Sequence, residues 1–223
     1  MPARSQSVLV VDDHPVVVAG LRLLFESAAE FRVVGEARDA FTARRLTEEL
    51  RPDLIVLDLV LGGRDGLELI EDLLALHETT KVLVYSSQDE VQYARRALRA
   101  GARGYVSKTA GLDAVGVALT TIAQGDVYVS ATVQRSLVRD YAESARGVAP
   151  APIDALSNRE LQVFRLLGTG LGSADVASEL RLSLKTVSTY RERLKNKLAL
   201  ENARELERAA EAFVRTGRLA GGT

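Results

Sequence analysis

The 223-residue sequence contains no cysteine and only two histidines. Without cysteine, neither disulfide bonds nor thiolate metal sites can support the fold, and a reducing compartment is favoured. The apolar runs are no longer than strands, and the first residues, MPARSQS, lack the apolar segment of a signal peptide. These absences predict a cytoplasmic protein that does not associate with a membrane.

The net charge is also small, at −1, but the charges are unevenly distributed. Residues 153–223 carry 12 Lys and Arg against 9 Asp and Glu, which gives +3, while the preceding residues carry 17 against 21, which gives −4. Hydrophobic residues make up 47% of the chain, enough to bury a sizeable core. The sequence therefore places an acidic half before a basic half.

Up to about residue 123, short apolar segments alternate with amphipathic ones. Strand-like segments occupy 8–11, 31–37, 53–59, 81–86 and 104–107, and helical patterns occupy 16–28, 39–50, 66–76, 90–100 and 113–123. Five such units with nearly all-apolar strands predict a doubly wound α/β domain built on a five-stranded parallel sheet. In this type of domain, the ligand site lies beyond the carboxyl ends of the strands.

The pattern changes in the second part of the chain. A helical stretch at 131–145 is followed by RGVAPAP (146–152), whose glycine and prolines are typical of a flexible linker. Every strong pattern beyond it is helical. We therefore expect three parts: the α/β domain at 1–128, a connecting helix and linker at 129–153, and an all-α domain at 154–223.

Polar side chains stand at the ends of four predicted strands: Asp12 and Asp13, Asp58, Ser86 and Lys108. Because the carboxyl ends of parallel strands share one edge, these groups can converge. Three neighbouring carboxylates need a cation, and an all-oxygen ligand set fits Mg²⁺ best. A lysine and a hydroxyl beside that ion suit a phosphoryl group, toward which Asp58 can act as a nucleophile. Alternatively, the aspartates only cap helices and begin turns, which explains each one singly but not the matched set.

The segments VLVVDDHPVVVAGL, DLIVLDLVLGGRDGLEL, VLVYSS and GYVSK resemble the receiver domain of bacterial two-component response regulators over residues 7–125. The resemblance implies a flavodoxin-like fold in which Asp58 accepts a phosphoryl group from a histidine of a sensor histidine kinase. It further implies that Mg²⁺ is bound by Asp13, Asp58 and the backbone carbonyl of Val60, with Asp12 helping through water. The same resemblance makes Ser86 and Lys108 the ligands of the phosphoryl oxygens, and Tyr105 the switch aromatic that turns inward when the Ser86 hydroxyl moves toward the phosphate.

Other side chains near this cluster add less chemistry. In the family, the side chains two positions after the phosphorylated aspartate and after the hydroxyl residue help to orient the attacking water, and here these are Val60 and Gln88. Because valine cannot hydrogen-bond to water, we expect slow self-dephosphorylation. His14 and His77 are interpreted as ordinary residues rather than as ligands or catalytic acids.

The all-α part contains a helix-turn-helix pattern. Ser157 stands three residues before Glu160 as in a capping box, and the helix that it opens runs to Gly168. A short helix at 174–180, a tight turn and a third helix, capped by Ser183 and reaching about residue 198, complete the pattern.

The third helix has two faces. Leu184, Val187, Tyr190, Leu194 and Leu198 form a stripe that is expected to face the core. The opposite face mixes charged, amide and hydroxyl groups, which suit base edges, and flanking cations suit phosphates. Six basic residues against one acidic between residues 181 and 197 favour DNA, although an ordinary solvated helix would also be charged. The predicted DNA contacts are Lys185, Thr186, Ser188, Thr189, Arg191, Glu192, Arg193 and Lys195, with Asn196 and Lys197 beside them.

Residues 154–217 resemble the LuxR/NarL-type helix-turn-helix, through LSNRE near its start and SLKTV on the third helix. Together, the two resemblances imply a NarL/FixJ-type transcriptional response regulator that binds double-stranded promoter DNA, as a homodimer when phosphorylated. The last helix carries an apolar stripe that includes Leu206, Ala210 and Phe213. Its first use is packing within the domain, and the resemblance adds a dimer contact as a second use; the sequence does not separate them.

Two other kinds of function are compatible with parts of the sequence. A phosphoaspartyl phosphatase of the haloacid-dehalogenase type also uses aspartate and Mg²⁺, but it has an acid two residues after the nucleophile, where this chain has Val60. A protein-interaction adaptor would use the C-terminal module only to dimerise. We expect a regulator rather than an enzyme.

Overall fold

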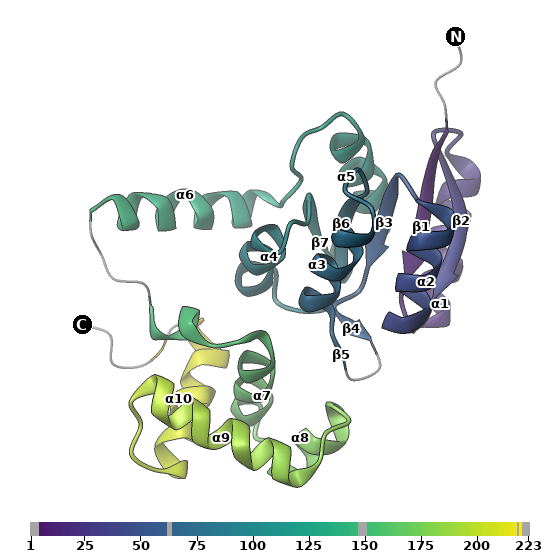
Figure 1. Ribbon diagram of the computed structural model, residues 1–223. Helices are drawn as coiled ribbons and strands as arrows, with labels where there is room; N and C mark the ends of the chain where they lie inside the picture. The colour runs from purple at the N-terminus through teal and green to yellow at the C-terminus, as the bar shows by residue number, and fades with distance from the viewer. Residues whose placement is uncertain (1–4, 62–63, 147–150, 218, 220–223) are drawn as a thin grey trace. The chain divides into compact units, whose positions relative to one another are not determined.

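The computed structural model describes residues 5–61, 64–146, 151–217 and 219. The chain forms two compact units, Met1–Ala142 and Glu143–Thr223 (Figure 1). Residues 147–150 of the predicted linker lie outside the described residues, and the limits 1–128, 129–153 and 154–223 stay predictions. Within the described residues, every helix is too short or too polar to cross a lipid bilayer.

The first unit is built on a five-stranded parallel sheet, which confirms the prediction. The strands are β1 (Gln6–Val11), β2 (Phe31–Ala37), β3 (Leu54–Leu57), β6 (Lys81–Ser86) and β7 (Gly104–Ser107), in the order β2-β1-β3-β6-β7. All four residues of β3 are buried, because the central strand of a parallel sheet is covered on both faces. The register aligns Val11 with Leu57 and Leu57 with Val84, so these strands end at the same edge.

Helices cover both faces of this sheet (Figure 1). The α-helices are α1 (Pro15–Ser27), α2 (Ala40–Leu50), α3 (Gly66–Leu76), α4 (Glu90–Arg99) and α5 (Asp113–Ala123). Apolar residues of α1 and α5 share one buried cluster with β1, β3, β6 and β7, and α2, α3 and α4 lie on the opposite face. Asp39 and Asp89 cap α2 and α4 by accepting from backbone amides of the first turn, as aspartate commonly does.

Four further elements lie wholly or mostly in the first unit. The two-residue strands β4 (Val60–Leu61) and β5 (Arg64–Asp65) pair antiparallel directly after Asp58, and the sequence did not predict them. Lys108–Ala110 form a 3₁₀ turn directly after β7. Helix α6 (Ala131–Ala145) begins after Ser130.

The second unit is all helical, as the sequence predicted. After a 3₁₀ turn at Pro152–Ala155 come α7 (Asn158–Gly168), α8 (Ser173–Glu179), α9 (Leu184–Leu198) and α10 (Ala203–Thr216). The rings of Phe164 and Phe213 lie 5.6 Å apart between α7 and α10. The two helices also approach closely at Gly168, where an added Cβ would lie 2.3 Å from the carbonyl oxygen of Ala210. Glycine is required there because any side chain would push α10 away.

Candidate functional site: a carboxylate pocket and a recognition helix

The polar residues at the strand ends converge at one edge of the sheet. Sheet hydrogen bonding continues past the strands: the Asp58 amide donates to the Val11 carbonyl at 2.9 Å, and the Asp12 amide donates to the Ala37 carbonyl at 3.0 Å. Asp12 and Asp58 are each 2% exposed, and Ser86 is fully buried. Burial of two carboxylates is costly unless each is paired, so the neighbouring groups decide whether this pocket is stable.

Lys108 supplies the positive charge in this pocket. Its Nζ lies 2.7 Å from Asp12 Oδ2 and 2.6 Å from Asp58 Oδ2, and its side chain is 12% exposed. Burial lowers the pKa of Lys108, but the charge of Asp58 and the hydrogen bonds to both carboxylates outweigh it, so the pKa lies above its ordinary value. Lys108 is therefore a cation at neutral pH and binds both aspartates at once.

Asp58 is also held through its other oxygen. Oδ1 accepts from the Ser86 hydroxyl at 2.7 Å and from the Val60 amide at 3.2 Å. The Val60 side chain itself is 39% exposed. Asp58 is thus fixed by a lysine, a hydroxyl and an amide. These three donors set the orientation of its carboxylate, and all three are groups that can bind anions.

Tyr105 is buried beneath the same edge. It is 1% exposed, and its hydroxyl donates to the Gln88 carbonyl at 2.9 Å. Burial raises the pKa of Tyr105 well above its ordinary value, so the phenol stays protonated and can donate. The ring is thus turned into the domain, while the Ser86 hydroxyl donates to Asp58.

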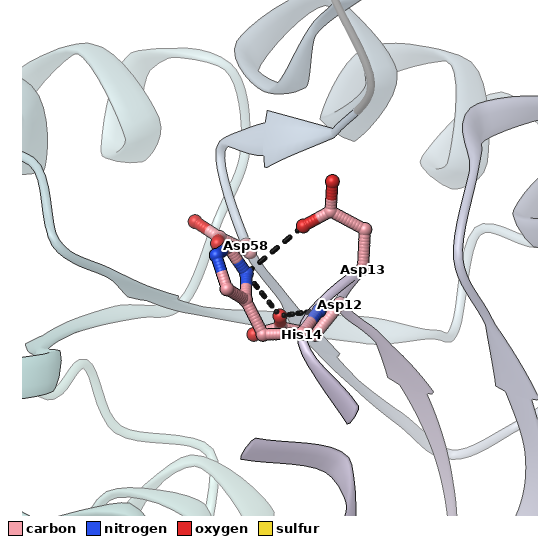
Figure 2. Close-up of side chains that lie close together, drawn as sticks. All are labelled: Asp12, Asp13, His14 and Asp58. Atoms are coloured by element: carbon pink, nitrogen blue, oxygen red, sulfur yellow. Dashed lines mark hydrogen bonds and ion pairs between the residues drawn. The ribbon is translucent and has the colours of Figure 1, made fainter. Parts of the chain in front are cut away.

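The pocket also has the donor set of a cation site. Asp12, Asp13, His14 and Asp58 each offer one ligand atom, and these atoms lie within 4.8 Å of one another (Figure 2). Asp13 Oδ1 is buried and, within the described part of the chain, accepts no hydrogen bond. Clustered carboxylate oxygens are hard ligands and fit a divalent cation such as Mg²⁺.

His14 lies nearer to this set than the sequence predicted. Its Nδ1 is 3.1 Å from Asp12 Oδ1 and 2.9 Å from Asp13 Oδ1, although 61% of its side chain is exposed (Figure 2). The signal in the sequence was its position directly after Asp13, which does not show how the ring turns. The other histidine, His77, instead contacts the Thr80 hydroxyl at 2.9 Å.

In the second unit, the predicted capping box is present and has an additional partner. Ser157 Oγ accepts from the Glu160 amide at 3.3 Å, and Glu160 Oε2 accepts from the Ser157 amide at 2.7 Å. The same Oε2 accepts from Lys197 Nζ at 2.7 Å, and Lys197 also donates to the Ala155 carbonyl at 3.1 Å. Burial raises the pKa of Glu160, but the bonds from Lys197 and Ser157 outweigh it and leave the pKa below its usual value.

Helix α9 presents one face to the core and one to solvent. Val187 and Leu194 are fully buried, but Leu184 is 57% exposed, so its predicted place in the core stripe is wrong. Leu184 is the first residue of α9, where the helix extends beyond the core. The opposite face is exposed as predicted, with Lys185, Ser188, Thr189, Glu192, Arg193 and Asn196 on it.

The remaining residues of the predicted DNA set are less free. Thr186 is half-buried at the helix start, where its amide donates to the Ser183 hydroxyl at 3.0 Å. Arg191 Nη2 lies 2.7 Å from Glu207 Oε1 on α10. Lys195 Nζ lies 2.9 Å from Glu192 Oε2 on its own helix. Two cations predicted to meet phosphates therefore already have carboxylate partners.

The dimer contact suggested for the last helix needs correction. Leu206 and Ala210 are fully buried, and Phe213 is 2% exposed within the second unit. A second chain cannot reach these side chains while the unit is folded. The stripe on α10 is used for packing, the first of the two uses that the sequence left open.

Comparison with known proteins matches both units. The model of the response regulator receiver domain matches residues 8–120, and that of the bacterial regulatory proteins of the luxR family matches residues 154–210. A putative transcriptional regulator of Pseudomonas aeruginosa is 38% identical over 86% of this chain and 90% of its own. The putative positive transcription regulator of virulence factors BvgA from Bordetella pertussis is also 38% identical, over 89% of this chain and 93% of its own. Among solved structures, RcsB from Salmonella enterica serovar Typhimurium, bound to promoter rprA in the presence of the phosphomimetic BeF₃⁻, is 25% identical with a TM-score of 0.62, covering 92% of this chain and 98% of that one.

Proposed function

Because the chain belongs to the LuxR family of response regulators, we propose that it is a transcription factor switched by phosphorylation of Asp58. The observation that carries this proposal is the convergence of Asp12, Asp58, Ser86 and Lys108 in one buried pocket. The family regulates transcription, and the absence of enzymatic turnover stays a prediction.

In the proposed reaction, a carboxylate oxygen of Asp58 attacks the phosphorus of a phosphohistidine on a sensor histidine kinase. The P–N bond breaks, the imidazole leaves, and an acyl phosphate forms on Asp58. Asp13, Asp58 and the backbone carbonyl of Val60 would hold Mg²⁺, with Asp12 acting through water. When bound, the ion would neutralise charge on the transferring phosphoryl group. Its fit is supported by the carboxylate oxygens and by the buried Oδ1 of Asp13.

The remaining groups of the pocket would receive the product. Lys108, which contacts Asp58 Oδ2, and Ser86, which donates to Oδ1, can each move their bond to a phosphoryl oxygen. Movement of Ser86 is coupled to Tyr105 through Gln88, whose amide lies 3.4 Å from Ser86 Oγ and whose carbonyl accepts from Tyr105. A phosphoryl group on Asp58 would therefore be read by Tyr105 and by the start of α4.

The exposed face of α9 would read the DNA. Lys185 and Arg193 are exposed cations there, and Ser188, Thr189 and Asn196 provide small polar groups. We propose a homodimer that binds paired half-sites in promoter DNA, through contacts other than the buried stripe of α10.

The test combines phosphotransfer with DNA footprinting. Full-length protein is incubated with a phosphodonor and Mg²⁺, and genomic footprints of the wild type are compared with those of Asp58→Ala. The wild type should take up one phosphoryl group and gain footprints, whereas Asp58→Ala should do neither. Asp126→Ala, which removes an exposed carboxylate of the same unit, is the matched control and should behave as the wild type. Phosphoryl uptake by Asp58→Ala would overturn the proposal.

A further inference from the structure

Three cations flank the DNA-facing side of α9, and each contacts a carboxylate. Lys195 pairs with Glu192 on its own helix at 2.9 Å, and Lys197 pairs with the buried Glu160 at 2.7 Å. Arg191 pairs with Glu207 on α10 at 2.7 Å, and this carboxylate, unlike that of Glu160, is exposed.

The Arg191–Glu207 pair is accessible from solvent on one side. The Glu207 side chain is 49% exposed, while that of Arg191 is 15% exposed. An ion pair with so exposed a partner contributes little to folding, typically about 0–1 kcal/mol. Stability of the second unit therefore does not explain why a carboxylate lies against this arginine.

The pair matters more for the charge that the recognition helix offers to DNA. A guanidinium binds carboxylate and phosphate through the same planar array of donors, so the two anions compete for it. Sequence-independent affinity for DNA comes from cations that replace counterions on the phosphates. Arg191 adds to that affinity only to the extent that it leaves Glu207.

We propose that Glu207 limits the affinity of this protein for the DNA backbone by holding Arg191 in an ion pair that phosphate must displace. The proposal rests on the DNA-binding function proposed above and assigns to α10 a part in setting it. Lys185 and Arg193, for which the described residues provide no ion-pair partner, contribute their full charge to the same face.

The chain offers a matched pair of substitutions on α10. Glu207→Gln and Glu211→Gln each remove one negative charge from an exposed position of the same helix, but of the two glutamates only Glu207 has a described contact with Arg191. Full-length protein is titrated into a fluorescently labelled duplex of arbitrary sequence, and anisotropy gives the affinity at several salt concentrations. Thermal unfolding of each variant confirms that it is folded.

Glu211→Gln should change affinity only through net charge. Glu207→Gln should bind about two- to fivefold more tightly than Glu211→Gln, the factor expected for release of one exposed ion pair. Its plot of log affinity against log salt should be steeper by up to about 0.9, the contribution of one additional phosphate contact. In an Arg191→Ala background, the two glutamine variants should become equal.

Two results would overturn the inference: equal affinity and salt dependence of the two single variants, or an advantage of Glu207→Gln that persists without Arg191. Either result would leave the DNA-binding function intact, because wild type and variants would still bind the duplex. Failure of the wild type to bind any duplex would instead overturn the proposed function, and this inference with it.

Discussion

Substitution of Lys108 by methionine should destabilise the first unit in a way that Mg²⁺ reverses. Lys108 is the cation that binds both Asp12 and Asp58, and these carboxylates are each 2% exposed. Removing one partner of a buried ion pair costs about 3–5 kcal/mol, because the other charge is left buried and unpaired. We expect the lower end, about 3 kcal/mol, because the side chain of Lys108 is 12% exposed and water can partly replace it.

Calorimetric unfolding of the full-length chain measures this effect. The transition that shifts with Mg²⁺ belongs to the first unit, and in EDTA it should fall by roughly 10 °C in Lys108→Met. The pocket of the variant is more negative, so Mg²⁺ should bind it more tightly and raise its transition more than that of the wild type. Asp58→Asn in the same background removes one of the unpaired charges and should restore part of the loss.

Lys81→Met is the matched control. Lys81 belongs to the same unit, but its Nζ donates to the carbonyls of Ile122 and Ala123, at 3.0 and 3.1 Å, at the end of α5. Its loss should lower the same transition without any special response to Mg²⁺. The charge argument for Lys108 is refuted if Lys108→Met unfolds at the same temperature as the wild type in EDTA. It is also refuted if Mg²⁺ raises the transition temperatures of Lys108→Met and the wild type by the same amount.

Two further predictions concern the phosphoryl lifetime and acid stability. Val60→Asn should hasten loss of the phosphoryl group from isolated phosphoprotein, because an amide can orient the attacking water; unchanged decay of the ³²P label would contradict this. Lys197→Met should lower the unfolding free energy by about 1–3 kcal/mol at neutral pH, since it removes a charged hydrogen bond to the buried Glu160. Because the pKa of Glu160 is lowered in the folded state, this contribution is present above the ordinary carboxyl pKa and is lost as the pH falls through the folded-state value. In urea titrations the difference between wild type and variant should therefore shrink steadily with increasing acidity, and a difference that does not shrink would refute it.

The sheet and the carboxylate pocket were predictable because their signals are local. Each inner strand is a short apolar run that ends directly in a polar residue, and parallel pairing then brings Asp12, Asp58 and Lys108 to one edge. The pair β4 and β5 was missed because strands of two residues carry no periodicity. The ring position of His14 was missed because adjacency in sequence does not fix a side-chain torsion.

In the second unit, the helical pattern of the sequence is insufficient to predict which side chains are buried and which ones pair between helices. The spacing placed Leu184 at the correct angle around α9, but an angle does not tell how far the core extends along the helix axis. The pairing of Arg191 with Glu207 depends on how α9 and α10 cross, which no spacing within either helix reveals. Lys195 and Glu192, three residues apart on one helix, could have been paired from the sequence.

The close contact at Gly168 excludes every other residue type from that position. The obstacle to a methyl group is a backbone carbonyl of α10, and backbone cannot rotate away as a side chain can. A library that randomises codon 168 and selects for resistance to proteolysis should return glycine almost alone. Substitutions tolerated in this protein would then fall on the exposed surface of α10, while the crossing of α10 over α7 at Gly168 stayed the same.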